Sequence, residues 1–149
     1  MPREPSLATL RELARCFQAF EAHSAAHIRT LGLTPPQFDI VATLGNTAGM
    51  SFKELGEKTL ITKGTLTGVV DRLEARGIVR RVVSHADRRS TRVELTDAGA
   101  ALFDEVFPGV VGRTKQVFDV FGETERLTLE ASLRRLREAF ESFPRKENQ

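Results

Sequence analysis

A run of small and polar residues between positions 62 and 72 could contact nucleic acid closely. The candidates are Thr62, Lys63, Gly64, Thr65, Thr67, Gly68 and Arg72. Hydroxyl and cationic groups hydrogen-bond to phosphates and to base edges, and glycine lets another surface approach. The run holds no acid before Asp71. It is interpreted as the base- and phosphate-contacting surface of a DNA-reading element; the alternative is an ordinary exposed polar face.

The same run has the periodicity of a helix. Its apolar residues recur at the three- and four-residue spacing that puts them on one face: Leu66, Val69, Val70 and Leu73. The hydroxyl of Thr62 is expected to cap the N-terminus, and Gly77 is expected to follow the C-terminus in a left-handed conformation. The polar candidates therefore belong to the outer face of this helix.

An arginine-rich hairpin is predicted next. Residues 78–83 and 91–95 are β-branched runs typical of two strands, joined by a polar loop that contains Asp87, Arg88 and Arg89. Arg80 and Arg81 could simply keep an edge strand soluble. Arginines at the tip of a hairpin suit the narrow minor groove, where the potential is most negative.

Local signals predict the helices that position these two elements. A long helix is expected over residues 7–31, ending at Gly32. Capping-box patterns at Thr34-Pro35-Pro36-Gln37 and Ser51-Phe52-Lys53-Glu54 open a second and a third helix. Two short helices, a turn and a helix with a polar outer face form a helix-turn-helix, and the hairpin makes it winged. Residues 34–97 are therefore assigned to a winged helix-turn-helix DNA-binding domain.

Residues 1–33 and 98–149 are expected to form a helical dimerisation region. The helix that follows Thr96 should kink or be interrupted at Pro108-Gly109. Nine of the ten phenylalanines lie outside residues 51–97, so apolar surface is concentrated in the flanking helices. A homodimer that buries it could read two half-sites about 34–36 Å apart. The fold class is mainly α, or α+β by element count.

Composition limits the classes of function. The chain has 149 residues, 40% of them hydrophobic and 28% charged, which is ordinary for a soluble single domain. Net charge is only +2, yet residues 51–97 carry +3, which is a local basic region. No membrane helix or signal peptide is evident, and one cysteine cannot form an internal disulfide, so the cytoplasm is expected. No catalytic motif is present, so neither enzymatic activity nor a cofactor is expected.

Three segments together resemble a known family. LTPPQFDIVATL, MSFKELGEKTLITKGTLTGVVDRLEARGIVRR and DRRSTRVELTDAG are similar, in this order, to the MarR family of bacterial transcriptional regulators. The likeness covers about residues 30–100 by motif and the flanking helices by pattern. It implies a homodimer with a winged helix-turn-helix in each subunit and an interface made by the N- and C-terminal helices.

The resemblance also implies roles for particular residues. Residues 62–68 correspond to the start of the recognition helix. The wing motif of the family falls on Asp87-Arg88-Arg89, with Arg89 reaching the minor groove and Asp87 bracing it. Many members release DNA when a small phenolic or similar aromatic ligand binds between the dimer helices and the DNA-reading unit.

Three other residues could belong to a sensor. Cys16 is reminiscent of the sensing cysteine in the hydroperoxide-responsive branch of the family, but this chain has no tyrosine to accompany it. Burial of Cys16 as a small apolar residue of the dimer helix is favoured. His23 and His27 have the i, i+4 spacing of metal ligands, yet no further ligand is evident, so no metal site is expected.

The sequence therefore predicts a sequence-specific DNA-binding transcriptional regulator. It is expected to be a ligand-responsive repressor that binds a pseudo-palindromic operator as a homodimer. One alternative is a thiol-based oxidative-stress sensor, which would lose its peroxide response on Cys16→Ser. Another is a winged-helix protein-interaction module, whose duplex binding would depend little on salt.

Overall fold

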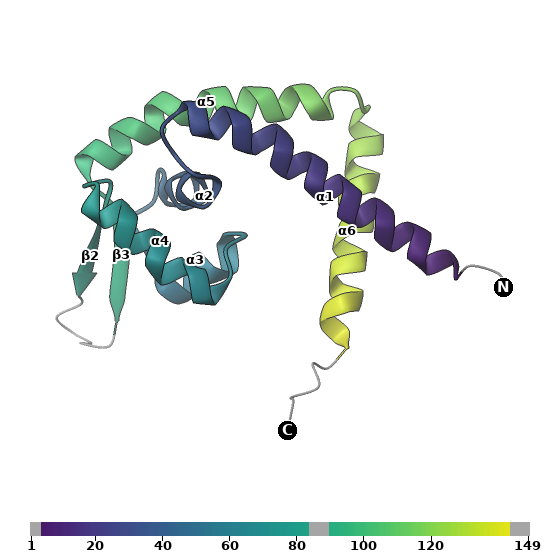
Figure 1. Cartoon of the computed structure of the whole chain (residues 1–149), viewed down its shortest axis with the longest axis horizontal. Coiled ribbons are helices and arrows are strands. Elements are labelled where there is room, and N and C mark those ends of the chain that lie inside the picture. The colour runs from purple at the N-terminus through teal and green to yellow at the C-terminus, as the bar shows by residue number, and fades with distance from the viewer. Residues whose placement is uncertain (1–3, 84–89, 144–149) are drawn as a thin grey trace. The chain divides into compact units, whose positions relative to one another are not determined.

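The computed structural model describes residues 4–83 and 90–143, and the fold is mainly helical, as predicted (Figure 1). The helices are α1 (Pro5–Thr30), α2 (Pro35–Leu44), α3 (Phe52–Lys58), α4 (Lys63–Ala75), α5 (Asp97–Phe118) and α6 (Glu123–Ser142). The strands are β1 (Met50–Ser51), β2 (Val79–Val83) and β3 (Thr91–Leu95). The chain divides into two compact units, Met1–Val110 and Val111–Gln149.

One antiparallel sheet with the strand order β1-β3-β2 lies in the first unit. The predicted hairpin is present, with Val79 opposite Leu95 and Val83 opposite Thr91. The sequence did not predict β1, in which Met50 pairs with Val93. A two-residue strand has no periodicity to detect, so only its partner strand defines it.

Both predicted capping boxes are confirmed, and they set where α2 and α3 begin. The Gln37 amide donates to Thr34 Oγ1 (3.3 Å), and Gln37 Oε1 accepts from the Thr34 amide (3.1 Å). Ser51 and Glu54 make the same reciprocal pair, at 3.1 and 3.4 Å. Each pair satisfies two amides that would otherwise lack a partner, which fixes the entry of the chain into its helix.

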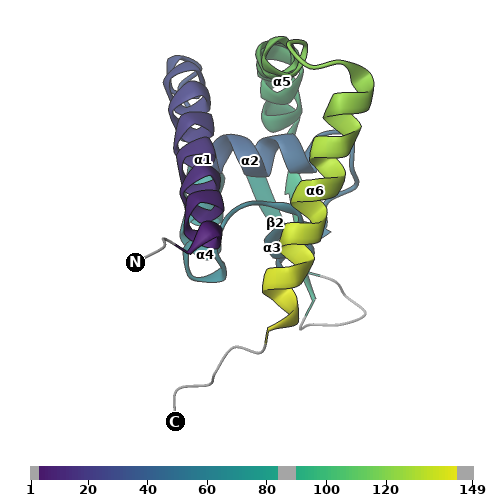
Figure 2. The ribbon, with the colours of Figure 1, turned by 90° about the vertical axis from the view of Figure 1, so that its right-hand side faces the viewer.

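The core of the first unit forms where α2, α3 and α4 meet the sheet. Its least exposed large side chains are Ile40, Val41, Leu44, Leu55, Val70, Leu73, Val79 and Val93. Figure 2 shows α2 running from α1 toward the strands. Helix α5 adds Phe103, whose ring lies against Gly45 so closely that a Cβ on that glycine would be 2.1 Å away. A glycine is therefore required at position 45.

Three local predictions were wrong. Thr62 is the N-cap residue of α4, but its hydroxyl makes no capping bond and pairs with Thr65 Oγ1 at 3.1 Å. Of the two outcomes expected at Pro108-Gly109, the interruption is wrong, because α5 is continuous from Asp97 to Phe118, whereas the kink stays a prediction. Pro108 and Asp104 are both exposed, so water can satisfy the Asp104 carbonyl that the proline leaves without an amide partner. The first strand of the hairpin, β2, begins at Val79 and not at Ile78 as predicted, because Ile78 belongs to the turn after α4.

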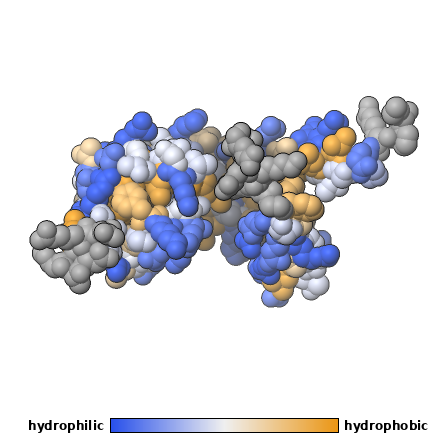
Figure 3. All heavy atoms as spheres, turned by 90° about the horizontal axis from the view of Figure 1, so that it is seen from below, coloured by the Kyte–Doolittle hydropathy of each residue, from blue (hydrophilic) through white to orange (hydrophobic). Residues whose placement is uncertain are grey.

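The second unit contains the last part of α5 and the whole of α6, and it has almost no buried core. Among residues 111–143 only Arg126 and Leu136 are half-buried; the other described residues are exposed. The exposed residues of this unit include large apolar side chains. On the face of the molecule drawn in Figure 3, hydrophobic residues lie beside hydrophilic ones at the surface. Within the described part of the chain, none of the helices has the length and apolar character needed to cross a membrane.

Candidate nucleic-acid interface

Helix α4 presents the predicted polar face to solvent. All seven candidates are exposed: Thr62, Lys63, Gly64, Thr65, Thr67, Gly68 and Arg72. The four apolar residues of the opposite face, Leu66, Val69, Val70 and Leu73, are all buried in the core. The packed face fixes how the helix is rotated about its axis, and this rotation turns the polar face outward.

The C-terminus of α4 leads directly into the hairpin through a glycine turn. Gly77 has a φ of +73°, as predicted. The Gly77 amide donates to the Glu74 carbonyl (2.9 Å), and the Ile78 amide donates to the Leu73 carbonyl (3.0 Å). This pair of bonds is a Schellman motif, which satisfies the last carbonyls of the helix. Strand β2 therefore starts at a fixed angle to α4.

Arg81 joins the hairpin to α4, a role that the sequence did not predict. Its guanidinium pairs with Asp71 and with Glu74 Oε1 (2.7 Å), and its amide donates to Glu74 Oε2 (3.0 Å). It also lies 5.5 Å from the centre of the Phe52 ring of α3. The hydrogen bond to Asp71 raises the pKa of Arg81 most, with Glu74 adding to the shift and burial opposing it. Arg81 thus offsets one of the two negative charges that Asp71 and Glu74 place on α4, which lowers the repulsion that a phosphate approaching the helix would meet.

The neighbouring arginines of the sheet hold the hairpin and the β1 turn. Arg80 donates to Glu94, which stands opposite it on β3, at 2.6 Å. Arg92 donates to the carbonyls of Ala48 (3.2 Å) and Gly49 (2.8 Å). Arg80 therefore does more than keep the edge strand soluble, since it forms a cross-strand ion pair.

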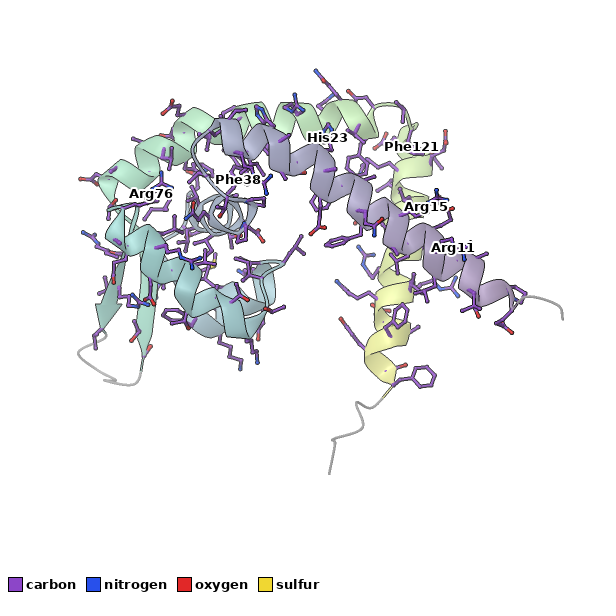
Figure 4. All side chains as sticks on the ribbon, viewed as in Figure 1. Arg11, Arg15, His23, Phe38, Arg76 and Phe121 are labelled. Atoms are coloured by element: carbon purple, nitrogen blue, oxygen red, sulfur yellow. The ribbon has the colours of Figure 1, made fainter. Side chains whose placement is uncertain are left out.

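Helix α2 has polar contacts with both ends of α4. At the C-terminal end, Arg76 Nη1 donates to Gln37 Oε1 (3.2 Å) and to the Gly32 carbonyl (3.0 Å); Figure 4 labels Arg76 together with Phe38, the neighbour of Gln37. Before the N-terminal end, the Leu60 amide donates to Asp39 Oδ2 (2.8 Å). Burial raises the pKa of Asp39, and the Leu60 hydrogen bond offsets part of that rise.

The predicted wing residues Asp87, Arg88 and Arg89 lie outside the described residues. The two strands that carry them are placed, however, and the Arg81 and Arg80 contacts fix those strands to α4 and to each other. The wing assignment stays a prediction.

The candidate sensor residues lie on α1. Cys16 is exposed, so the expected burial does not occur within a single chain. His23 is exposed, whereas Nε2 of His27 is buried and has no hydrogen-bond partner among the described residues. No three His, Cys, Asp or Glu side chains in the described ranges are close enough to hold a metal ion.

Comparisons with known proteins agree with this arrangement. The MarR family model matches residues 33–91. The regulator MhqR of Bacillus subtilis is 30% identical over 122 residues, which is 82% of this chain and 84% of MhqR.

Solved structures extend the likeness to the flanking helices. The structure of BpsR of Bordetella bronchiseptica, whose DNA binding is regulated by 6-hydroxynicotinic acid, is 29% identical with a TM-score of 0.80 and covers 92% of this chain and 98% of its own. NadR in complex with 4-hydroxyphenylacetate is 25% identical with a TM-score of 0.73, covering 91% and 95%.

The family match spans α2, α3, α4 and β2 and ends at the first residue of β3, and the alignment with MhqR covers most of both chains. The chain belongs to the MarR family and is a DNA-binding, helix-turn-helix transcriptional regulator.

Proposed function

We propose that the protein is a ligand-responsive repressor that binds a pseudo-palindromic operator as a homodimer in the cytoplasm. The observation that carries the proposal is the exposed polar face of α4. The buried face of α4 holds that surface in place, and Arg81 pairs with both acids of the helix. No catalytic role is proposed.

The residues of α4 suit two kinds of DNA contact. Lys63 is the first residue of the helix, where the amide groups and the helix dipole favour a phosphate. Thr65 and Thr67 can bond to base edges or contact a thymine methyl. Arg72, two turns further along, suits a phosphate of the flanking backbone. Arg89 of the wing is proposed to enter the adjacent minor groove, with Asp87 orienting it and Arg88 beside it.

Exposed apolar surface supports the homodimer. Large apolar side chains on α1, the end of α5 and α6 remain solvent-accessible in a single chain: Leu7, Leu10, Phe17, Phe20, Val111, Val117, Phe118, Leu127, Leu129, Leu133 and Phe140. A monomer that left this much apolar surface in water would be prone to association. A second copy that covered these helices would also bury Cys16 of α1, which is exposed in a single chain.

A small hydroxylated aromatic acid is the proposed effector. BpsR responds to 6-hydroxynicotinic acid, and NadR was solved with 4-hydroxyphenylacetate. In this chain the buried Nε2 of His27 faces Gly109 of α5, where a Cβ would lie 4.0 Å away. An unpaired buried imidazole nitrogen is suited to bond to a carboxylate or a phenol. Such an effector releases DNA only if it binds the DNA-incompetent state more tightly.

Salt-dependent duplex binding tests the function. Duplexes are first selected from a random library with the wild-type protein, and their affinity is then measured over a salt series. Affinity should fall steeply with salt, and Lys63→Ala should lower the magnitude of the log–log slope by about 1 per subunit, because one phosphate contact is lost.

Lys115→Ala is the matched control for Lys63→Ala. It removes an exposed lysine of α5 that pairs with Asp119 at 2.8 Å, and it should leave the slope unchanged. A flat salt response of the wild type would instead support the protein-interaction module.

A further inference from the structure

Among the described residues, directional contacts between α2 and α4 occur only just beyond the two ends of α4, at Leu60 before it and at Arg76 after it. Between those ends the two helices are in contact, and each contributes buried apolar side chains to the same core, among them Ile40 and Val41 of α2 and Val70 and Leu73 of α4. Packing of apolar side chains restricts the crossing angle of two helices to preferred classes with a scatter of about 15–20°, so it holds α4 against α2 without fixing its tilt closely. Hydrogen bonds have narrow limits of distance and angle, and the tilt therefore depends on the polar contacts at the ends.

The contact at the C-terminal end connects α4 to the corner between α1 and α2. A single nitrogen of Arg76 donates to the Gly32 carbonyl and to Gln37 Oε1. Gly32 is the left-handed residue at which the chain leaves α1, and Gln37 is buried within the capping box that starts α2. Gln37 Oε1 therefore accepts from both Arg76 and Thr34, so the position of α4 is tied to the start of α2.

The contact before the N-terminal end of α4 is also made by α2, through Asp39, which lies two residues after Gln37. Asp39 is half-buried, and its carboxylate accepts from the Leu60 amide at 2.8 Å. The residues on either side of Leu60 are also fixed, because Thr59 is buried and Ile61 packs against the core. The turn that starts α4 is therefore held from α2 through one carboxylate.

We infer that Arg76 and Asp39 are positioning residues through which α2 sets the orientation of the recognition helix. Arg76 acts through Gln37 and Gly32, and Asp39 acts through the Leu60 amide. Neither residue needs to touch DNA for this role. The inference rests on the proposed function, because it assigns the residues that present the DNA-reading face of α4.

Two substitutions with opposite charge changes test this inference. Arg76→Met removes a positive charge, and Asp39→Ala removes a negative one. Electrostatics alone predicts that Asp39→Ala strengthens binding to duplex DNA, since the protein becomes more positive. The positioning role predicts that both variants bind the selected duplex about tenfold more weakly, as expected when a good base contact is lost in each half-site.

Three further readouts separate positioning from other roles. The salt slope should be unchanged in both variants; a slope lowered by about 1 per subunit in Arg76→Met would make Arg76 a phosphate contact and overturn the inference. Affinity for a scrambled duplex should change much less than affinity for the selected one. Arg76→Lys should restore most of the loss, because an ammonium group can donate to both oxygens.

Controls keep the result interpretable. Lys115→Ala removes an exposed lysine that pairs with Asp119 on α5, and it should not lower the ratio of selected to scrambled affinity. Unchanged affinity of both test variants, or tighter binding by Asp39→Ala, would overturn the inference while leaving the proposed function intact. A wild-type protein that selects no duplex would overturn both. The midpoint of thermal unfolding is measured for each variant, and a midpoint well above the assay temperature shows that the variant is folded in the binding assay.

Discussion

Gly64 and Gly68 are exposed on α4, and nothing in the described part of the chain requires glycine at either position. A Cβ at either position would meet no described atom within 4 Å, and neither residue has a positive φ. Glycine within a helix costs about 0.5–1 kcal/mol relative to alanine. Absent side chains at two positions one turn apart leave a shallow gap on the face that is proposed to approach DNA.

Gly68→Ala should therefore stabilise the protein and weaken its DNA binding. We expect the midpoint of thermal unfolding to rise by about 2–4 °C, from the higher helix propensity of alanine. Affinity for the selected duplex should fall at least about fivefold, because an added methyl group in a close-packed interface costs about 1 kcal/mol or more. Differential scanning fluorimetry and fluorescence anisotropy measure the two effects.

Gly112→Ala provides the comparison, since Gly112 lies in α5 with equally open space around its Cα. It should raise the unfolding temperature by a similar amount without changing DNA affinity. If Gly68→Ala binds the selected duplex as tightly as the wild type, α4 does not approach the bases closely at this position.

Residues whose roles depend on near neighbours in sequence were predictable, and those with distant partners were not. The capping pairs span three residues, and Gly77 follows the last turn of its own helix. Arg81 instead meets Asp71 ten residues away, and Arg76 reaches Gly32 over 44 residues. Such partners become neighbours only after the chain has folded. Local sequence patterns therefore identified Arg81 only as a positively charged residue of a strand.

Among the secondary-structure elements, helix α2 contains a carboxyl group, that of Asp39, whose ionisation is disfavoured by burial in the folded chain. Burial raises the pKa of Asp39 above its ordinary value of 3.8. Below that value Asp39 is protonated in both the folded and the unfolded chain. As the pH rises, the unfolded chain ionises first, so the free energy of unfolding decreases until the pH has passed the folded-state pKa.

Asp39→Asn removes this titration, because asparagine stays neutral while keeping an oxygen that can accept from the Leu60 amide. The free energy of unfolding of the wild type, minus that of the variant, should fall with rising pH across the acidic range above 3.8. Urea denaturation of both proteins at a series of pH values measures the difference. Parallel pH profiles, or a difference that grows with pH, would contradict the assigned direction of the pKa shift.

Elements with strong periodicity were predicted almost to their ends, whereas weak or context-dependent elements were not. Helix α4 and strand β3 begin where the sequence placed them. Helix α1 begins two residues earlier than expected, since Glu4 accepts from the Ser6 amide and Pro5 suits the first helical position. Strand β1 depends on β3 for its definition, and α5 continues past Pro108 although a proline removes one hydrogen bond of the helix.

For the whole molecule, the distribution of burial differs sharply between the two compact units. The first contains all the buried apolar residues of the core, whereas the second has exposed apolar side chains along α6. Leu129, Leu133 and Phe140 recur on one face of that helix at 100° per residue. The distribution of phenylalanines in the sequence predicted this surplus, and the division into a DNA-binding domain at 34–97 and flanking dimerisation segments stays a prediction.

Leu133→Glu should dissociate the proposed homodimer, because a carboxylate would have to be buried in the apolar face of α6 without a partner. In one chain Leu133 is already 49% exposed, so the substitution should leave the fold of the first unit unchanged. Multi-angle light scattering should then give the mass of a monomer. Affinity for the selected duplex should fall at least about a hundredfold, because two linked half-site contacts become independent. Thr128→Glu adds the same charge at an exposed position of α6 roughly 140° around the helix from Leu133, and should stay dimeric. If both variants remain dimers with full affinity, α6 does not form the interface, and the exposed apolar residues of α1 become the remaining candidates for it.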